Sequence, residues 1–460
     1  MTSPQYWELE PRDSELYWEG CRLSELAARF GTPLYVVNAK MLEKSVAAFR
    51  QAFAAQGLKS GIFFSYKTNP VPEALRRLAA LDVGAEVISE TEFELAQRLG
   101  LTGERIIVNG SNKTASLLRL AVRQGAALIT VQTAAELAAL ERISGDLGLP
   151  ANAGLRINPC LRGRLTDLTI STGTRSSPIG FVRESEDWRA ALSILGQSSG
   201  LRFRGIHFHI GSGIKDSSPY REAMTKTMGF LDDLLERGLV PRILDIGGGF
   251  SISTLREIGL WEAFCLFAWN RPQKPPQPQG SARMPTEVAA ICAKRLRQHR
   301  TEHGIPPLSI YVEPGRAISA SSQILLLTVR SVVQRGRRRP AAICDGGAMS
   351  LSPLLLTEYH SLFIANKIGL PCGKKYDLYG SLPTPLDLVA ARRDLPELAA
   401  GDVVAVMDTG AYFTSLGNNF AGPRPAIVLI EDGRANLIRR RETWKDMFSR
   451  DVSPGTGSLP

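Results

Sequence analysis

Lys67 stands at the end of a short apolar run, IFFSYK (62–67). Apolar surroundings disfavour the charged form of a lysine, and a neutral amine can add to a carbonyl group to form an imine. The alternative is an ordinary lysine whose long side chain carries its ammonium group to solvent. Lys67 is therefore a candidate nucleophile. The choice between the two alternatives depends on the other candidate site residues in the sequence.

Three consecutive glycines, Gly247, Gly248 and Gly249, end the segment RILDIGGG (242–249). Because glycine has no Cβ atom, backbone N–H groups in such a run can approach an anion closely. The alternative is a tight turn between a strand and a helix, with no ligand. The run predicts a turn that can bind a phosphate group.

Glu313 belongs to the segment SIYVEPGR (309–316), in which Gly315 and Arg316 follow it. A carboxylate beside the ring nitrogen of pyridoxal 5′-phosphate (PLP) would keep that nitrogen protonated, so that the ring withdraws electrons from the α-carbon of a bound amino acid. The alternative is an ion pair between Glu313 and Arg316, and Arg316 could instead bind the phosphate. An amine, a phosphate turn and a carboxylate together indicate a PLP site.

Two histidines lie in the segment HFHIGSG (207–213). His209 could stack on the cofactor ring. His207 is two residues away and points the same way in a strand, so alternation does not separate the two. Ser212 and the glycines beside it could add contacts to the phosphate.

Eight β-rich runs position these residues, and helical patterns separate the runs. The eight are IFFSYK (62–67), VGAEVIS (83–89), RIIVNG (105–110), ALITV (127–131), AGLRIN (153–158), FRGIHFHIG (203–211), RILDIGGG (242–249) and SIYVEPGR (309–316). This alternation predicts an α/β fold built on a TIM-like (β/α)8 barrel, whose active-site groups gather at the C-terminal ends of the strands. Glu86 then lies on the same rim as Lys67 and Glu313. A doubly wound open sheet is the alternative, but no GxGxxG follows the first strand.

Two of the helical patterns begin with a capping box. Ser89 is followed three residues later by Glu92, and Thr133 by Glu136. A third pattern, 218–238, has a proline near its first turn and a glycine at its end. These signals predict where the helices between the strands begin and end.

With 460 residues the chain is long enough for two domains. The barrel is predicted over 36–320, with an exposed Pro-rich insertion near 270–285 before the last barrel helix. Residues 321–450 are β-rich with few long helical patterns, which predicts a mostly antiparallel β domain. Residues 1–35 are predicted to join that β domain, and 451–460 to form a disordered tail.

Composition narrows the class of protein. The net charge of +10 favours an anionic cofactor, an acidic substrate or an acidic partner. The basic run RGRRR (335–339) is interpreted as a solvated turn, so no nucleic acid is expected.

Six cysteines without a CxxC pair and only five histidines predict no metal site. There is no apolar run of the roughly 18 residues that a membrane span needs and no signal peptide, so a cytoplasmic protein is expected.

Taken in order, the motifs resemble the fold-type III PLP-dependent decarboxylases, the family of ornithine, arginine and diaminopimelate decarboxylases. FFSYKTNP resembles the segment that holds PLP as a Schiff base, here through Lys67. GIHFHIGSG resembles the segment whose second histidine, His209, stacks on the ring. IGGGF resembles the phosphate loop, and VEPGR the segment in which Glu313 pairs with the ring nitrogen and Arg316 faces the phosphate. The tyrosine of GAYFTSLGNNFAGPRP (410–425), Tyr412, would approach the phosphate.

The resemblance implies the two-domain architecture of alanine racemase, decarboxylation of an amino acid through a quinonoid carbanion, and a homodimer with shared active sites. One departure affects the chemistry. GSLPTPLD (380–387) has Pro383 where the family has the cysteine that returns a proton to the α-carbon, although Asp387 is retained. Proline cannot donate a proton. The replacement candidates are Thr384, Tyr359, His360 or an ordered water.

The substrate segment also departs from the family. MSLSPLLLTEYH (349–360) has Ser352 before Pro353, where diaminopimelate decarboxylases have an Ile-Arg-Pro element that binds the distal carboxylate. The position of the acidic diamine contact of ornithine decarboxylases is Thr357. We expect a less common amino acid as the substrate, and the Pro-rich insertion and the basic charge would allow a bulky or carrier-tethered acidic one. The candidate substrate contacts are Thr357, Glu358, Thr384 and Asp387.

Two other functions stay open at this stage. One is a different PLP reaction at the α-carbon, such as racemisation, or decarboxylation coupled to oxidation or transamination. Alanine racemases place an arginine at the ring nitrogen, so Glu313 argues against simple racemisation. The other is a decarboxylase homologue that binds a partner without catalysis, and intact Lys67 and Glu313 argue against that.

Overall fold

The computed structural model describes residues 3–162, 172–259, 261–262, 265, 274–278, 283–304 and 306–452. The chain divides into two compact units. The barrel unit comprises Glu43–Ile252 and Gly280–Ile318, and the sheet unit comprises Met1–Leu42, Ser253–Gln279 and Ser319–Pro460. Each unit is described separately below.

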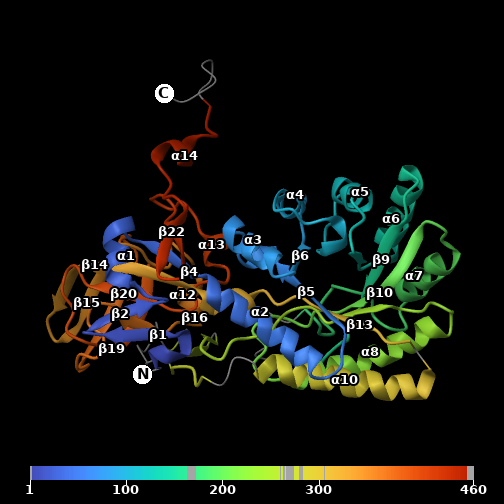
Figure 1. The fold of residues 1–460 in the computed structure, drawn as a ribbon, viewed down its shortest axis with the longest axis horizontal. Coiled ribbons are helices and arrows are strands. Elements are labelled where there is room, and N and C mark those ends of the chain that lie inside the picture. The colour runs from blue at the N-terminus through green and yellow to red at the C-terminus, as the bar shows by residue number, and fades with distance from the viewer. Residues whose placement is uncertain are drawn as a thin grey trace. The chain divides into compact units, whose positions relative to one another are not determined.

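Eight parallel strands close the barrel, as the alternation of strands and helices predicted (Figure 1). In chain order they are β5 (Ser60–Ser65), β6 (Gly84–Val87), β7 (Ile106–Val108), β8 (Leu128–Val131), β9 (Ala151–Arg156), β10 (Leu201–His207), β11 (Ile243–Asp245) and β13 (Ser309–Val312). β13 pairs with β5 and completes the ring. All eight correspond to the β-rich runs of the sequence, so the TIM-like fold is confirmed.

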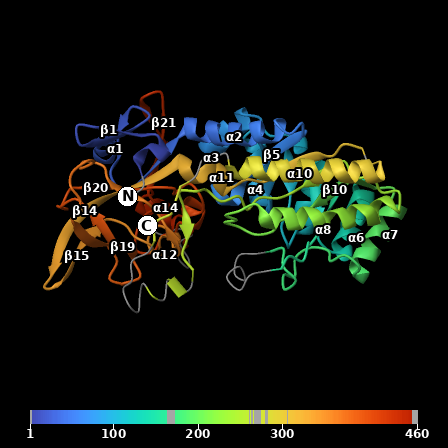
Figure 2. The same cartoon turned by 90° about the horizontal axis from the view of Figure 1, so that it is seen from below.

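Helices connect the strands on the outside of the barrel. They are α2 (Ala39–Ala54), α3 (Pro72–Ala80), α4 (Glu90–Arg98), α5 (Ala115–Arg123), α6 (Ala134–Leu147), α7 (Glu186–Gln197), α8 (Ser218–Leu235) and α10 (Arg283–His303), with the short turns η2 (Tyr66–Thr68) and η3 (Gly103–Arg105). Figure 2 shows α8 and α10 lying side by side. None of the helices among the described residues is both long enough and apolar enough to cross a membrane.

The predicted capping residues begin α4 and α6. The side chain of Ser89 accepts a hydrogen bond from the Glu92 amide, and the side chain of Thr133 accepts one from the Glu136 amide. In a strict capping box the Glu92 carboxylate would accept from the amide of Ser89, but here it accepts from the amide of Ile88, one residue earlier. The two helix starts were therefore predicted correctly, but the reciprocal hydrogen bond at α4 was not.

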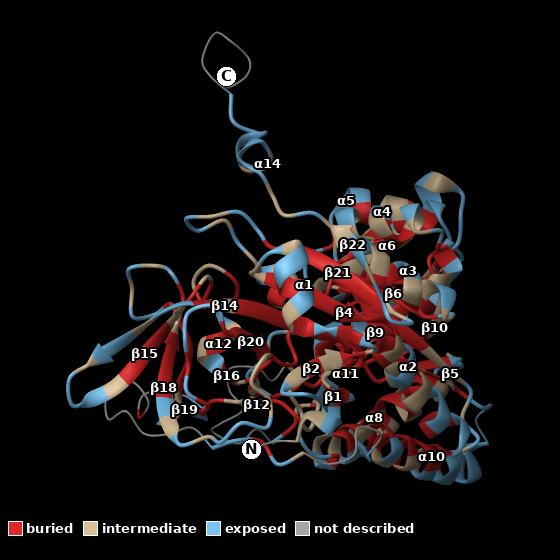
Figure 3. Ribbon diagram, turned by 60° about the vertical axis from the view of Figure 1, so that its left-hand side comes forward, coloured by how far each residue is buried: buried red, intermediate tan, exposed pale blue. Residues whose placement is uncertain are grey.

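The sheet unit is built on a nine-stranded sheet with a largely antiparallel order. Its strands are β4 (Leu34–Asn38), β14 (Gln323–Arg335), β15 (Arg338–Cys344), β17 (Leu362–Ile364), β18 (Lys374–Tyr379), β19 (Leu388–Leu395), β20 (Val403–Val406), β21 (Ala426–Glu431) and β22 (Arg434–Arg439). β4 lies between β14 and β21. Figure 3 shows these central strands as largely buried. The predicted β domain is confirmed in its strand content.

The N-terminal segment adds a small sheet of β1 (Leu9–Arg12), β2 (Glu15–Trp18) and β3 (Cys21–Arg22), with η1 (Pro4–Trp7) before it and α1 (Leu23–Phe30) after it. The indole N–H of Trp7 donates to Asp408 at 2.7 Å, and that of Trp18 donates to the Trp7 carbonyl at 2.8 Å. Both indoles are fully buried in a core with apolar residues of β4 and β14. These contacts fix the N-terminal segment in the sheet unit.

Shorter elements complete the sheet unit. They are β12 (Arg256–Glu257), β16 (Glu358–Tyr359), α11 (Arg316–Ser319), which begins in the barrel unit, η5 (Ala320–Ser322), α12 (Leu354–Thr357), α13 (Phe413–Leu416) and α14 (Trp444–Phe448). β12 pairs with β16, which explains why the segment after Ile252 groups with this unit. The basic run turns at 336–337 between β14 and β15, and Arg335 pairs with Asp377 at 2.5 Å.

The unit boundaries differ from those expected. The boundary drawn at 35–36 would cut β4, which belongs wholly to the sheet unit. The insertion predicted at 270–285 ends earlier, because Arg283 already begins α10 and Pro285 is buried in it. Of the rest of that insertion only 274–278 are described. The predicted tail lies outside the described residues except for 451–452.

Candidate active site

Lys67 and Glu86 form an ion pair at the C-terminal end of the barrel. Lys67 lies in η2, directly after β5, and Glu86 lies in β6 opposite Ser65 of β5. The Glu86 side chain is buried, whereas that of Lys67 is 37% exposed. The partner of Lys67 is therefore a buried carboxylate rather than purely apolar side chains. A carboxylate paired with an amine favours the charged form of that amine and can accept its proton.

Glu313 follows β13 and is held by Asn109, which follows β7. The side-chain amide of Asn109 donates to Glu313 Oε1 at 2.6 Å and to Glu86 Oε1 at 3.4 Å. His207 Nε2 lies 3.4 Å from the same Glu313 oxygen. Asn109 thus links the carboxylate predicted for the ring nitrogen with the carboxylate that pairs with the amine.

Asp245, at the end of β11, is a third buried carboxyl group in this cluster. Burial, and then the nearby negative charge of Glu313, raise the pKa of Asp245 well above its ordinary value. Burial also raises the pKa of Glu313, but His207 and Lys67 outweigh it and hold that pKa below its ordinary value. The two opposite shifts favour the negative charge on Glu313 over that on Asp245.

The two histidines of HFHIGSG have different environments. His207 ends β10 and is buried beside Glu313, whereas His209 lies beyond the strand and its Nδ1 accepts the Gly248 N–H at 3.1 Å. Burial, and then the charge of Arg156, lower the pKa of His209 to about 3. His209 is therefore neutral, with its proton on Nε2. Strand alternation failed to separate the two because the strand ends between them.

The three glycines allow three close approaches of backbone. A Cβ atom on Gly247 would lie 2.5 Å from the Phe208 carbonyl oxygen, one on Gly248 2.4 Å from that of Glu313, and one on Gly249 2.3 Å from that of Gly211. Gly247 and Gly249 also have positive φ angles, 66° and 94°. The run must therefore be glycine on packing grounds alone, before any ligand is considered.

Two of the three N–H groups in the predicted phosphate turn donate hydrogen bonds to side chains of the protein. The Gly247 amide donates to Asp245 Oδ1 at 2.8 Å, and the Gly248 amide donates to His209. These two N–H groups orient Asp245 and His209, and the phosphate contacts predicted for the three glycines stay predictions. The Ile214 amide donates to the Gly249 carbonyl at 2.9 Å, so the segment with Ser212 lies beside the third glycine. Gly315 packs closely too, since a Cβ there would lie 2.2 Å from Thr68 Oγ1.

The barrel residues fit PLP in chemical type. A primary amine, an ionised carboxylate, a neutral imidazole and a glycine turn lie on one rim, from β5, β6, β10, β11 and β13. Residues 39–320 match the family described as pyridoxal-dependent decarboxylase, pyridoxal binding domain. The chain belongs to this family.

Known decarboxylases resemble the chain over nearly its whole length. A diaminopimelate decarboxylase of Aquifex aeolicus is 32% identical over 95% of both chains, and one of Bacillus subtilis is 29% identical over 94% of both. A crystal structure of the diaminopimelate decarboxylase from M. jannaschii in co-complex with L-lysine has a TM-score of 0.86 at 26% identity, and covers 97% of this chain and 98% of that one. The chain is accordingly a PLP-dependent amino-acid decarboxylase, and the family resemblance is confirmed.

Three residues of this decarboxylase site were missed by the sequence analysis: Asn109, Arg156 and Asp245. Arg156 ends β9, and burial lowers its pKa although Glu313 and Glu86 oppose that shift. All three stand at or directly after the C-terminal ends of barrel strands. The rule that identified Lys67 and Glu313 could therefore have found them.

Arg316, also a predicted residue, is buried at the start of α11 in the barrel unit, and the other predicted residues of the decarboxylase belong to the sheet unit. Tyr412 is half-buried at the start of α13 with a φ of 66°. Thr357 is exposed at the end of α12, and Glu358 is buried in β16 with a carboxylate oxygen 3.4 Å from His360 Nε2. Their contacts with the cofactor or substrate stay predictions.

Asp387 has a structural role within its own loop. Its Oδ1 accepts the Met349 amide at 2.9 Å, and its Oδ2 accepts the Leu382 amide at 3.0 Å. The side chain is fully buried. Both oxygens thus accept from backbone donors, so Asp387 shapes the segments that carry Pro383 and Ser350, and its substrate contact stays a prediction.

The proposed acids near position 383 differ in accessibility. Pro383 is exposed, and Thr384 Oγ1 accepts the Leu386 amide at 3.3 Å. His360 is buried, and its Nδ1 lies 2.8 Å from the Met407 carbonyl oxygen. The ring of Tyr359 lies under the Arg393 guanidinium at 3.6 Å. Tyr359 and Thr384 are the partly exposed members of this group.

Proposed function

We propose that this decarboxylase acts on an α-amino acid other than diaminopimelate, with PLP held through Lys67. The observation that carries the proposal is a contrast between the units. The barrel keeps an amine, Lys67, and an ionised carboxylate, Glu313, whereas the sheet unit has Ser352 and Pro383 where the family resemblance implies a substrate-binding arginine and a proton-returning cysteine.

The names of the relatives support decarboxylation but do not decide the substrate. Ser352 is fully buried, and its hydroxyl accepts the Leu354 amide at 3.4 Å. A short neutral hydroxyl cannot form the two parallel charged hydrogen bonds that an arginine makes with a carboxylate. A distal carboxylate would therefore lose its main charged partner at this position.

In the barrel, each residue has a separate task. When bound, PLP withdraws electrons from the α-carbon, so that the α-carboxylate can leave as CO2. Lys67 Nζ holds the cofactor, and Glu86 takes or returns the proton at that nitrogen. Glu313, kept ionised, holds a proton on the ring nitrogen, and Asn109 orients its carboxylate.

His209 and Asp245 complete this arrangement without adding charge. The neutral imidazole of His209 is proposed to stack on the ring, oriented by the Gly248 amide. Because burial and the charge of Glu313 raise the pKa of Asp245, the neutral form of Asp245 is favoured beside an ionised Glu313. The proposed phosphate contacts are Ser212, the turn of Gly247, Gly248 and Gly249, Gly315, Arg316 and Tyr412.

The proton that replaces CO2 at the α-carbon must come from a group other than residue 383. Thr384, Tyr359, His360 and an ordered water are the proposed sources, contributed across a homodimer as in the family resemblance. Light scattering tests the dimer, and turnover of Tyr359→Phe and Thr384→Val in deuterated solvent tests the first two side chains. A bulky or carrier-tethered acidic substrate stays part of the proposal because of the +10 net charge.

The central test is CO2 release by the PLP-loaded protein from a panel of L- and D-amino acids that includes diaminopimelate. Release from another amino acid, with much higher kcat/KM than from diaminopimelate, supports the proposal. Efficient release from diaminopimelate rejects the substrate assignment. An amine product indicates simple decarboxylation, an aldehyde indicates decarboxylation coupled to oxidation or transamination, and an inverted amino acid indicates racemisation. Bound PLP without any turnover supports a role in binding a partner without catalysis.

A further inference from the structure

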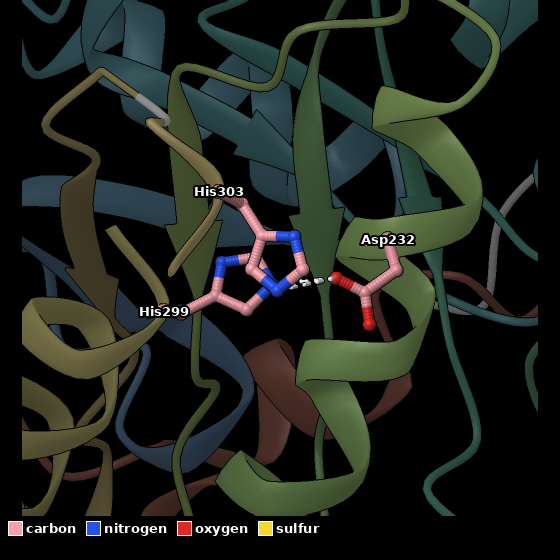
Figure 4. Close-up of side chains that lie close together, drawn as sticks. All are labelled: Asp232, His299 and His303. Carbon is pink, nitrogen blue, oxygen red and sulfur yellow. Dashed lines mark hydrogen bonds and ion pairs between the residues drawn. The ribbon is translucent and has the colours of Figure 1, made fainter. Parts of the chain in front are cut away.

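We propose that Asp232, His299 and His303 form a binding site for a zinc-class divalent cation on the outer face of the barrel. These residues lie on α8 and α10, away from the strand ends that carry Lys67 and Glu313. Figure 4 shows both imidazoles facing the carboxylate. The inference does not depend on which amino acid the enzyme decarboxylates.

The spacing within α10 brings the two histidines to one face. Residues four apart in a helix are neighbours on its surface, so His299 and His303 stack with ring centroids 4.5 Å apart. α8 packs against α10 and supplies Asp232 opposite them. Two imidazoles from one helix turn and a carboxylate from its neighbour make a three-ligand arrangement.

The distances suit a tetrahedral ion. Asp232 Oδ1 lies 2.8 Å from His299 Nε2 and 3.7 Å from His303 Nε2, and one possible ligand atom from each residue lies within 4.8 Å of the others. Bonds of about 2.0–2.1 Å to zinc place tetrahedral ligand atoms about 3.3 Å apart. The two distances from Asp232 Oδ1 lie on either side of that value.

The three ligands differ in exposure, so that a metal ion could reach the site from solvent and still be held by a buried side chain. His299 is buried, with a side chain only 4% exposed, whereas Asp232 and His303 are 32% and 43% exposed. The Nδ1 atom of His299 has no hydrogen-bond partner among the described residues. A buried imidazole with only one polar partner gains from a strong bond to a cation at Nε2, and the exposed His303 can close over the ion.

The donor set indicates the class of metal. Imidazole nitrogen suits zinc, copper, iron and nickel, whereas magnesium and calcium prefer all-oxygen sites. Asp232, His299 and His303 are the three ligands that the structure brings together, and water could fill the fourth position. Zinc with these three protein ligands and a water is the simplest occupant.

An ion here would join two helices that flank catalytic strands. α8 follows β10, which ends at His207, and α10 precedes β13, which leads to Glu313. The ion would therefore act as a clip that stabilises the barrel unit rather than as a reacting centre. The composition analysis expected no metal site, and the His-x3-His spacing within α10 did not enter that expectation.

The test is zinc titration of the full-length, PLP-loaded protein without a histidine tag, followed by calorimetry. We expect one zinc ion per chain at this site and a rise in melting temperature with zinc concentration. Asp232→Asn keeps the shape of the ligand and His303→Ala removes an exposed one. Each should weaken zinc binding by more than about 100-fold, beyond the effect of losing an outer-shell partner.

Lys294→Ala, an exposed change on the same helix, is the matched control and should bind zinc as the original chain does. The melting temperature without zinc shows whether each variant is folded. Anomalous scattering at the zinc edge should place the ion among the three side chains. The proposal is overturned if the original chain binds zinc no more tightly than the two ligand variants, or if the ion lies elsewhere.

Discussion

Asn109 connects the two carboxylates of the active site, donating at 2.6 Å to Glu313 and at 3.4 Å to Glu86. Removal of one partner from a buried charged hydrogen bond costs about 1–3 kcal/mol. Asn109→Ala should therefore weaken PLP binding by about 10-fold or more, because 1.4 kcal/mol corresponds to a factor of ten. A PLP titration followed by absorbance measures this. An unchanged affinity would show that Glu313 is oriented without Asn109.

Lys67 is expected to be indispensable for covalent attachment of the cofactor. Lys67→Ala should lose the visible absorbance band of the bound cofactor and all measurable CO2 release. Lys59→Ala is the matched control, because Lys59 directly precedes β5 at the end opposite Lys67 and is exposed. Retention of the band in Lys67→Ala, with the band lost in another lysine variant, would reassign the attachment site.

The stability of the cofactor-free protein should depend on pH through His209. Its pKa is about 3 in the folded protein and has an ordinary value of 6.5, so between these values the unfolded chain binds more protons. The free energy of unfolding should therefore fall as the pH decreases below about 6.5, by at most about 1.4 kcal/mol per pH unit for this group. His207, whose pKa burial also lowers, acts in the same direction.

Urea unfolding at several pH values between about 7 and 5 measures this slope. His209→Asn removes the titrating ring, so its stability should change less with pH than that of the original chain. Equal slopes in the two proteins would mean that His209 is protonated as easily when folded as when unfolded.

Much of the architecture was predictable because the barrel repeats one local pattern eight times. The strand ends then identified Lys67, Glu86 and Glu313 without knowledge of their contacts. Local patterns do not identify partners, however. LYVVN (34–38) reads equally well as a barrel strand, and only its pairing with β14 and β21 places it in the sheet unit. For the same reason Asp232, on a different helix from the two histidines, could not be joined to them from the sequence.

Gly248→Ala should damage the site through packing alone. The added Cβ would lie 2.4 Å from the Glu313 carbonyl oxygen, and overpacking of this kind costs about 1–3 kcal/mol. Gly196→Ala is the contrasting control, because nothing lies near its Cβ and alanine favours a helix interior by about 1 kcal/mol. Thermal unfolding should show opposite shifts for the two variants. A neutral Gly248→Ala would mean that the turn can relax.

Asp387→Asn separates a structural role from a substrate contact. The asparagine keeps the size of the side chain but has one carbonyl oxygen, so either the Met349 or the Leu382 amide loses its acceptor. A buried amide without a partner costs about 1–3 kcal/mol, so the free energy of unfolding should fall by that amount. KM at a temperature where the variant is folded should change little. If Asp387→Asn instead raises KM strongly and leaves unfolding unchanged, the carboxylate contacts the substrate, as its retention in the family segment first suggested.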